Sequence, residues 1–219
     1  MPPSPPALAQ LALSFERPDE SPQGLLAWLD GLPRTTGPAA AGLNLTRLDT
    51  PLGPMLAGAT DEGVCLLEFV ERRQLHAELL ELAQRLQVPL LERSNPHFGP
   101  LRTQLAEYFA GARQAFTVPL HTPGSAFQQA VWQALTQIPY GHTRSYGQQA
   151  LALHKPEAVR AVAAANGQNR VAILIPCHRV IGADGKLTGY AGGLWRKQRL
   201  LALEQQHRAP AAGQQIRLF

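Results

Sequence analysis

The feature that most constrains the fold of this chain is a change in its hydrophobic pattern near residue 122. Before that point, short apolar runs alternate with turn residues such as Pro51–Pro54 and Asp61–Gly63, which predicts strands joined by hairpin-like connections. The three predicted strands are Leu43–Leu48, Met55–Ala59 and Val64–Phe69. Beyond residue 122 the pattern becomes that of short, capped helices. We therefore expect a sheet-containing unit followed by a mostly helical one.

Two helices are predicted to complete the first unit. Leucines recur at helical spacing over residues 75–86, and a second apolar side runs through residues 98–110. Residues 116–120 are a candidate further strand. Cys65 lies inside the third predicted strand, and we interpret it as a buried structural thiol.

The second unit opens with two capping-box patterns. Ser125 stands three residues before Gln128, and Ser145 three residues before Gln148, which predicts a helix start after each serine. Pro156 suits the first turn of a third helix, which Asn166–Gly167 would end. Two short helices separated by a brief turn suggest a DNA-binding helix-turn-helix, although most such pairs are ordinary helical corners.

These patterns give the predicted fold class and domains. The class is α/β (α+β): a small N-terminal α/β domain with an antiparallel sheet over residues 43–122, then a mostly helical, winged helix-turn-helix-like domain over residues 123–205. Residues 1–42 are interpreted as a poorly specified extension. Its apolar piece Gly24–Leu29 is a candidate helix too short to fold alone. Residues 206–219 are expected to be a flexible tail.

Composition excludes several classes of protein. No wholly apolar run is longer than Val171–Ile175, so no membrane span or membrane partner is expected. Residues 1–6 lack the pattern of a secretory signal. The two cysteines are far apart, which excludes a disulfide scaffold and a four-thiolate zinc site. A reducing, cytoplasmic compartment is the expected location, and we expect no metal and no organic cofactor.

Charge is distributed unevenly along the chain. Residues 1–122 hold nine Lys/Arg and thirteen Asp/Glu, whereas residues 123–205 hold nine and three. A basic second half favours a polyanionic partner such as nucleic acid, and the alternative is a simple solubility feature.

The third predicted helix of this basic half is unusually rich in alanine. Arg160 is its only strong polar group in the middle, whereas a helix that reads bases in the major groove carries several long polar side chains. A slim helix permits close backbone approach to a groove without sequence choice. The alternative is that the alanines pack a tight helix–helix contact, and both can hold on different faces.

The segment Ile173–Val180 carries the chemistry. An apolar run leads into Pro176, Cys177 and His178, and a cysteine beside His and Arg is a candidate nucleophile of low pKa. Adjacent side chains point apart, so a bridging water is the natural relay between Cys177 and His178. Glu204 is a candidate group to orient His178. Its alternative role, a solvated carboxylate at a helix end, is the one that sequence alone favours.

The run Pro176–Val180 resembles the active-site motif of the O6-alkylguanine-DNA alkyltransferases, the single-use methylated-DNA–protein-cysteine methyltransferases. The similarity is strong and ungapped over about residues 125–204, looser over residues 43–120, and absent over residues 1–42. The flanking matches are Ser145–Tyr146 before Gln148, Arg160–Val162, Ala165–Asn169 and Gly189–Leu194 before Glu204.

The resemblance implies an enzyme for direct-reversal DNA repair. Its partner would be double-stranded DNA containing O6-alkylguanine, with O4-alkylthymine as a second candidate lesion, and the protein would act as a monomer. Each molecule would transfer one alkyl group irreversibly to its own cysteine after flipping the base out of the stack.

The resemblance also implies roles for individual residues. Cys177 would accept the alkyl group, His178 would take its proton through a water, Glu204 would orient His178, and Asn169 would brace the hinge beside the DNA-binding helix. Arg160 would fill the space of the extruded nucleotide and Tyr146 would help to rotate it out. The carbonyls of Cys177 and Val180 would bind the guanine amino group, and amides near Tyr190 and Ala191 would face O6.

The chain departs from the family pattern at a few positions. Arg170 and Ala172 stand where the family often has proline, and Ala163 replaces a common glycine, so a more flexible loop and a phosphate contact from Arg170 are expected. Ala191 stands where serine is frequent. Residues 11–37 are a candidate remnant of a regulator-type helix-turn-helix.

Three alternative functions remain open. The first is a non-catalytic alkyl-base sensor, although such relatives lack the cysteine that is present here. The second is a sequence-specific helix-turn-helix regulator, which the alanine-rich helix disfavours. The third is a Cys–His hydrolase, which the adjacent Cys–His placement disfavours.

Overall fold

The computed structural model describes residues 22–32 and 42–208. Its first domain is built on a four-stranded sheet of β1 (Leu43–Leu48), β2 (Met55–Ala59), β3 (Val64–Phe69) and β4 (Leu90–Glu92). The sheet order is β3-β2-β1-β4: β2 is antiparallel to both of its neighbours, and β4 is parallel to β1. The three strands predicted from turn spacing are confirmed with the same bounds.

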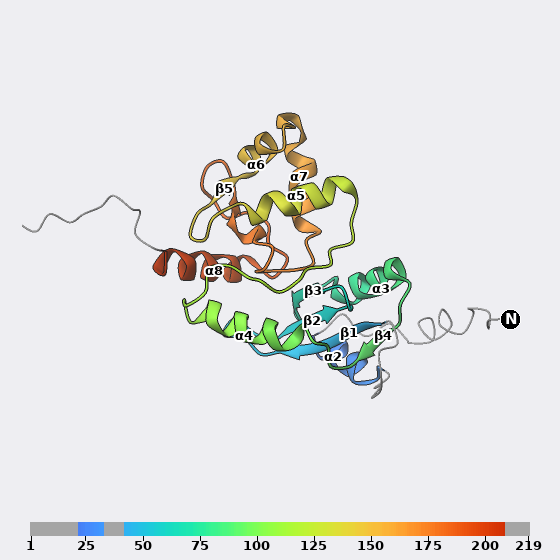
Figure 1. Ribbon diagram of the computed structural model, residues 1–219. Helices are drawn as coiled ribbons and strands as arrows, with labels where there is room; N and C mark the ends of the chain where they lie inside the picture. The colour runs from blue at the N-terminus through green and yellow to red at the C-terminus, as the bar shows by residue number, and fades with distance from the viewer. Residues whose placement is uncertain (1–21, 33–41, 209–219) are drawn as a thin grey trace, which may run out of the picture.

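Helices cover both faces of this sheet, as Figure 1 shows. On one face, α2 (Pro22–Asp30) and α3 (Leu75–Leu86) share a core with the side chains of Leu45, Leu56 and Leu66. On the other face, α4 (Phe98–Phe109) and the second domain share a core with Met55, Ala57 and Phe69. Because both faces are covered, nearly every residue of β1, β2 and β3 is buried.

Three details of the first domain differ from expectation or extend it. Residues 116–120 form no strand; a single parallel bridge joins Leu120 to Val64. Pro119 has no N–H to donate, which limits further pairing. The three-residue strand β4 was not predicted. Within the N-terminal extension, α2 buries Trp28 and Leu29 on the sheet, whereas residues 11–21 and 33–37 of the proposed regulator remnant lie outside the described residues.

The second domain is mostly helical. Helices α5 (Ala126–Thr136) and α6 (Tyr146–Ala152) both begin at the predicted capping boxes, with reciprocal bonds at Ser125–Gln128 and Ser145–Gln148. Pro156 starts a 3₁₀ turn, η1 (Pro156–Ala158), which leads into α7 (Val159–Gly167). The chain then passes through η2 (Cys177–Arg179), β6 (Val180–Ile181), which pairs with β5 (Arg144–Ser145), and α8 (Leu194–Gln206).

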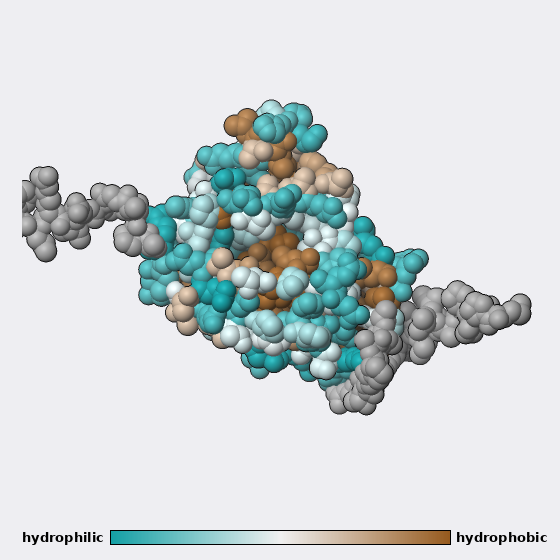
Figure 2. All heavy atoms as spheres, in the orientation of Figure 1, coloured by the Kyte–Doolittle hydropathy of each residue, from teal (hydrophilic) through white to brown (hydrophobic). Residues whose placement is uncertain are grey.

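The two domains pack against each other, with α8 and α4 on facing sides of the junction (Figure 1). Most of the face in Figure 2 is hydrophilic, and a hydrophobic area lies at its centre, where the domains meet. Among the helices that the structure describes, none is long and apolar enough to cross a bilayer. Residues 209–219 of the predicted tail lie outside the described part of the chain.

Candidate active site

Cys177 is presented by a buried segment that runs along the outer side of β3. Leu67 donates its N–H to Arg170 O, and Ala172 returns an N–H to Leu67 O, both at 2.8 Å. Residues 171–176 are all buried. The expected looseness from the missing prolines is therefore not what the structure shows, because this segment is held by pairing and burial instead.

Two tight turns, at Ile173 and Pro176, lead the chain into Cys177. Ile173 has φ 71°, and Leu174 N donates to Ala172 O across it, which is the rare γ-turn geometry. Pro176 lies at the centre of the second turn, where Cys177 N donates to Ile175 O at 2.8 Å. A β-branched residue at positive φ is strained, at a cost of about 1–3 kcal/mol, and such strain is common at functional sites.

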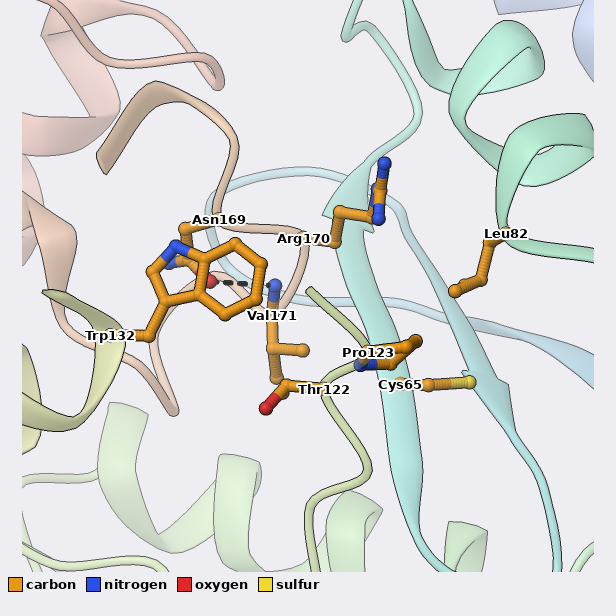
Figure 3. A pocket seen from close by; sticks show the side chains of 8 residues that line it. All are labelled: Cys65, Leu82, Thr122, Pro123, Trp132, Asn169, Arg170 and Val171. Carbon is orange, nitrogen blue, oxygen red and sulfur yellow. Dashed lines mark hydrogen bonds between the residues drawn. The ribbon is translucent and has the colours of Figure 1, made fainter. Parts of the chain in front are cut away.

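Asn169 joins the end of α7 to the cysteine. Its Nδ2 donates to Ile175 O at 2.8 Å and to Cys177 Sγ at 3.3 Å. Its Oδ1 accepts the N–H of Val171 at 3.0 Å, the bond drawn in Figure 3. One buried amide therefore fixes both ends of the segment and contacts the sulfur.

Glu204 orients the ring of His178. His178 Nε2 lies 2.8 Å from Glu204 Oε1, and both side chains are fully buried. Burial alone would raise the pKa of Glu204, but hydrogen bonds from His178 and Arg179 outweigh it and hold that pKa far below its usual range. An ionised carboxylate can only accept, so Nε2 carries the proton and Nδ1 is a bare acceptor. The alternative of a solvated Glu204 is wrong.

Glu204 accepts five hydrogen bonds from residues that the structure describes. Besides His178, Tyr108 Oη donates at 2.8 Å, Gly141 N at 3.0 Å, and Arg179 through Nε and Nη2 at 2.9 Å each. Sequence analysis missed Tyr108, which comes from α4 of the first domain. Its position in the sequence could have indicated this role, because Tyr108 follows Leu101 and Leu105 on the buried side of that helix. A buried phenol hydroxyl needs a hydrogen-bond partner.

The protonation states of the cysteine and the histidine differ from expectation. Burial raises the pKa of the Cys177 thiol to about 11, although the Asn169 hydrogen bond opposes this. The expectation of a low-pKa cysteine is therefore wrong for the resting protein. Burial also lowers the pKa of His178, so its ring is neutral near pH 7. Within the described residues, His178 Nδ1 has no hydrogen-bond partner and is free to take a proton.

Cys177 opens into a cavity of about 320 Å³, within the range of small-molecule sites. Both domains line it, and its residues are Glu68, Arg72, Tyr146, Ala163, Asn166, Gly167, Asn169, Cys177, Gly189, Tyr190, Ala191 and Gly192. The structure thus brings Tyr146, Tyr190 and Ala191 together with the cysteine, as expected.

The loop over this cavity is tied down from α8. Lys197, which is fully buried, donates from Nζ to Thr188 O at 2.7 Å and to Gly189 O at 3.2 Å. Tyr146 Oη adds a 3.4 Å bond to Thr188 O. At Gly192 an added Cβ would stand 2.6 Å from Phe69, so the loop approaches the sheet as closely as a glycine allows.

Two other predicted residues, Arg160 and Val180, are not among those that line the cavity. Arg160 is exposed on α7 and has no hydrogen bond or ion pair with any residue in the described ranges. On the same helix Ala165 is buried in the core, as the packing interpretation requires, while Ala161 and Ala164 are exposed, and the groove interpretation stays a prediction. Val180 is buried in β6, and its N–H donates to Cys177 O.

Arg170 forms an ion pair within the protein. Its Nη2 lies 2.6 Å from Glu81 Oε2 on α3, and its side chain is 13% exposed. This pairing holds the cation against the first domain, which corrects the expected phosphate contact.

Figure 3 shows a second, much smaller pocket, and Asn169 lines both this pocket and the cavity beside Cys177. Its volume is about 10 Å³, room for one water at most, and it is lined by Cys65, Leu82, Thr122, Pro123, Trp132, Asn169, Arg170 and Val171. Cys65 is 1% exposed, and burial raises its pKa to about 12, as expected for a structural thiol. No three His, Cys, Asp or Glu side chains of the described residues are grouped to hold a metal ion.

Family models and relatives match most of the chain. Residues 45–122 match the model of the 6-O-methylguanine DNA methyltransferase, ribonuclease-like domain, and residues 126–206 match that of the 6-O-methylguanine DNA methyltransferase, DNA binding domain. A methylated-DNA–protein-cysteine methyltransferase of Methanosarcina barkeri is 42% identical over 159 residues, which cover 72% of this chain and 94% of that protein. One from Mycobacterium bovis is 45% identical over 172 residues, covering 75% and 93%.

A solved structure is also similar to this chain. Mycobacterium tuberculosis OGT, in its complex with DNA, is similar to this chain with a TM-score of 0.65 and 42% identity. The match covers 77% of this chain and 96% of that one.

Proposed function

We infer the function from one premise: the chain belongs to the 6-O-methylguanine DNA methyltransferase family, whose two domain models together span residues 45–122 and 126–206. Its activity is direct-reversal DNA repair, in which the alkyl group of O6-alkylguanine in DNA passes to a cysteine of the protein. We propose that Cys177 is that cysteine. The observation that carries this assignment is that Cys177 opens into the cavity of about 320 Å³ while His178 presents a bare Nδ1.

The proton leaves Cys177 first, through a water, to His178 Nδ1. Because Glu204 is ionised and hydrogen-bonded to Nε2, it stabilises the imidazolium that forms. The resting thiol, with its pKa of about 11, is thus activated only when the relay is in place. Asn169 Nδ2, 3.3 Å from Sγ, donates to the sulfur and stabilises its negative charge.

The thiolate then attacks the alkyl carbon in line with its bond to O6. The S–C bond forms as the C–O6 bond breaks, and the electron pair of that bond moves through O6 into the guanine ring. A ring nitrogen of the guanine then takes a proton from water, while the imidazolium of His178 returns its proton to water. The product thioether is a poor leaving group, so each molecule reacts once. In this proposal the carbonyls of Cys177 and Val180 bind the guanine amino group, and the amides at Tyr190 and Ala191 face O6.

Base extrusion precedes this chemistry, since the O6-alkyl group lies inside the duplex. Arg160 fits the space of the flipped nucleotide because it is exposed, unpaired among the described residues and flanked by small side chains on α7. Tyr146, at the cavity wall, helps to turn the nucleotide outward. We further propose that the protein works in the cytoplasm, where free thiols such as Cys65 and Cys177 persist.

The test is mass spectrometry of the protein after incubation with a duplex containing O6-methylguanine. Wild type and Cys65→Ser should each gain the mass of one CH₂, on the peptide that contains Cys177. Cys177→Ser should gain nothing, because a serine hydroxyl is not ionised near neutral pH, while still binding the duplex. A methyl group found on Cys65, or gained by Cys177→Ser, would refute the assignment.

A further inference from the structure

Arg196 is a buried cation at the junction of the two domains, and the proposed reaction does not use it. It lies in the first turn of α8, it is 2% exposed, and it is not among the residues that line the cavity beside Cys177. A guanidinium stays charged in proteins, so its removal from water is costly unless its N–H groups find acceptors. The acceptors of Arg196 therefore indicate what this buried charge does.

Two of these acceptors belong to the first domain. Arg196 Nε donates to Leu52 O at 2.8 Å, in the turn between β1 and β2, and Nη2 donates to Glu71 Oε2 at 2.9 Å, just beyond the end of β3. The guanidinium also lies over the Phe69 ring, 4.3 Å from its centroid, and over the Trp195 ring, at 4.4 Å. Hydrogen bonds and ring contacts together fix the planar group against the first domain.

The third acceptor belongs to the loop that lines the cavity. Arg196 Nη1 donates to Gly192 O at 2.9 Å, and this bond is buried. Gly192 lines the cavity together with Gly189, Tyr190 and Ala191. One side chain therefore links the first domain to the wall of the cavity that holds the attacking sulfur.

This cavity loop, residues 188–193, needs such ties to keep its position. It has glycines at positive φ near both ends, Gly189 at 48° and Gly193 at 90°, and glycine gives the backbone the most conformational freedom. Lys197 holds the first end of the loop through two backbone carbonyls, at 2.7 and 3.2 Å. Arg196 holds the other end, and only Arg196 of these two bonds also to the first domain among the described residues.

We propose that Arg196 is a positioning residue for alkyl transfer, which holds the cavity loop in its reactive place from the first domain. In the proposed reaction the amides of Tyr190 and Ala191 face O6, and Gly192 is the next residue along the loop. A misplacement of about 1 Å in a group that positions the substrate can cost about 100-fold in rate. The inference rests on the proposed function, since it concerns transfer to Cys177.

The experiment measures single-turnover reactions with a saturating duplex that contains O6-methylguanine and with free O6-benzylguanine. Arg196→Met keeps an unbranched apolar stem but has no donor, and Arg196→Lys keeps the charge but lacks the planar fork. Arg199→Met is the matched control, because Arg199 is exposed on the same helix and has no hydrogen bond or ion pair with any described residue. The amplitude of each reaction reports the fraction of folded protein, and the rate constant reports positioning in the folded molecules.

We expect the rate constant of Arg196→Met to fall by about tenfold or more with both substrates, because the loop acts on the base after its extrusion. The rate constant should fall less in Arg196→Lys and stay at the wild-type value in Arg199→Met.

A wild-type rate constant in either Arg196 variant, whatever its amplitude, would mean that the side chain serves stability alone, and overturns the inference. A loss confined to the duplex substrate would place Arg196 in DNA binding or base extrusion, and overturns it as well. If the wild-type protein itself takes up no methyl group from the duplex, the proposed function is refuted.

Discussion

Tyr108→Phe tests whether the first domain supports the catalytic network, because it removes one hydroxyl and little else. That hydroxyl donates to Glu204 Oε1 at 2.8 Å, and both side chains are fully buried. A hydrogen bond to a charged group contributes about 1.5–3 kcal/mol. For a chain of this size that loss lowers Tm by about 3–12 °C.

Tyr140→Phe is the matched control. Tyr140 packs edge-on against Tyr108, with ring centroids 6.0 Å apart, but its buried hydroxyl has no partner among the described residues. Removing an unpaired hydroxyl should leave stability unchanged or raise it slightly. The same chemical change at two neighbouring rings should therefore give different results.

The assay is urea unfolding of the two variants and wild type at pH 7, followed by the rate of reaction with free O6-benzylguanine. Four hydrogen bonds to Glu204 remain in Tyr108→Phe, so His178 keeps its orientation and the rate should fall by less than about tenfold. Equal stability losses in the two variants, or no loss in Tyr108→Phe, would show that the phenol does not support Glu204.

Three further predictions follow from the same geometry. The rate of the wild-type reaction with the free base should not change from about pH 7 to about pH 10, because the reactive thiolate–imidazolium pair holds as many protons as the resting thiol–imidazole pair. In His178→Gln the rate should be lower and should rise about tenfold per pH unit, because only the ionised thiol reacts. A rate independent of pH in His178→Gln would contradict the proton relay. Arg160→Ala should slow repair of saturating duplex strongly and the free-base reaction little, whereas equal losses would mean that Arg160 supports the fold. Burial raises the pKa of Glu68 from 4.5 to about 7, so the stability contributed by its protonated form is complete below pH 4.5 and is lost as pH rises through 7. The free energy of unfolding of Glu68→Gln, measured in urea and compared with that of wild type, should therefore rise by up to about 3 kcal/mol between pH 5 and pH 8. A difference between the two proteins that does not change with pH would contradict the raised pKa of Glu68.

Local patterns predicted those parts of the fold that local residues determine. The strands Leu43–Leu48, Met55–Ala59 and Val64–Phe69 are bounded by turns, and α5 and α6 begin at capping boxes, so each boundary is fixed within a few residues of the chain. The strand β4 was missed because it has three residues and pairs in parallel with a strand more than forty residues earlier. Periodicity within a window carries no information about such a partner.

The same limit applies to the candidate site. Cys177 and His178 are adjacent in one segment, which is why the sequence grouped them, whereas the role of Asn169 came from the family resemblance alone. Glu204 was weighed as a solvated carboxylate because nothing near it in the chain shows its five hydrogen bonds. Tyr108 was missed since it reaches the site only after the two domains dock.

Glu68 and Arg72 show this limit on the first-domain side. Their sequence neighbourhood is that of an ordinary strand end, and only the packed structure shows that they meet the cavity of Cys177. The pKa of that thiol was misjudged for a related reason: adjacent cations are visible in the sequence, whereas burial, which dominates here, is not.

The pairing of residues 170–172 with Leu67 has a consequence for how the protein can be divided. β3 is an outermost strand of the sheet, and an uncovered outer strand is a template for aggregation. Here residues 170–172 and the Leu120 bridge occupy its free side. A fragment ending near residue 122 would leave much of that side bare, and its partner fragment would lose the support beneath Cys177. We therefore expect the first domain to aggregate when it is expressed alone, and the intact chain to unfold as a single cooperative unit.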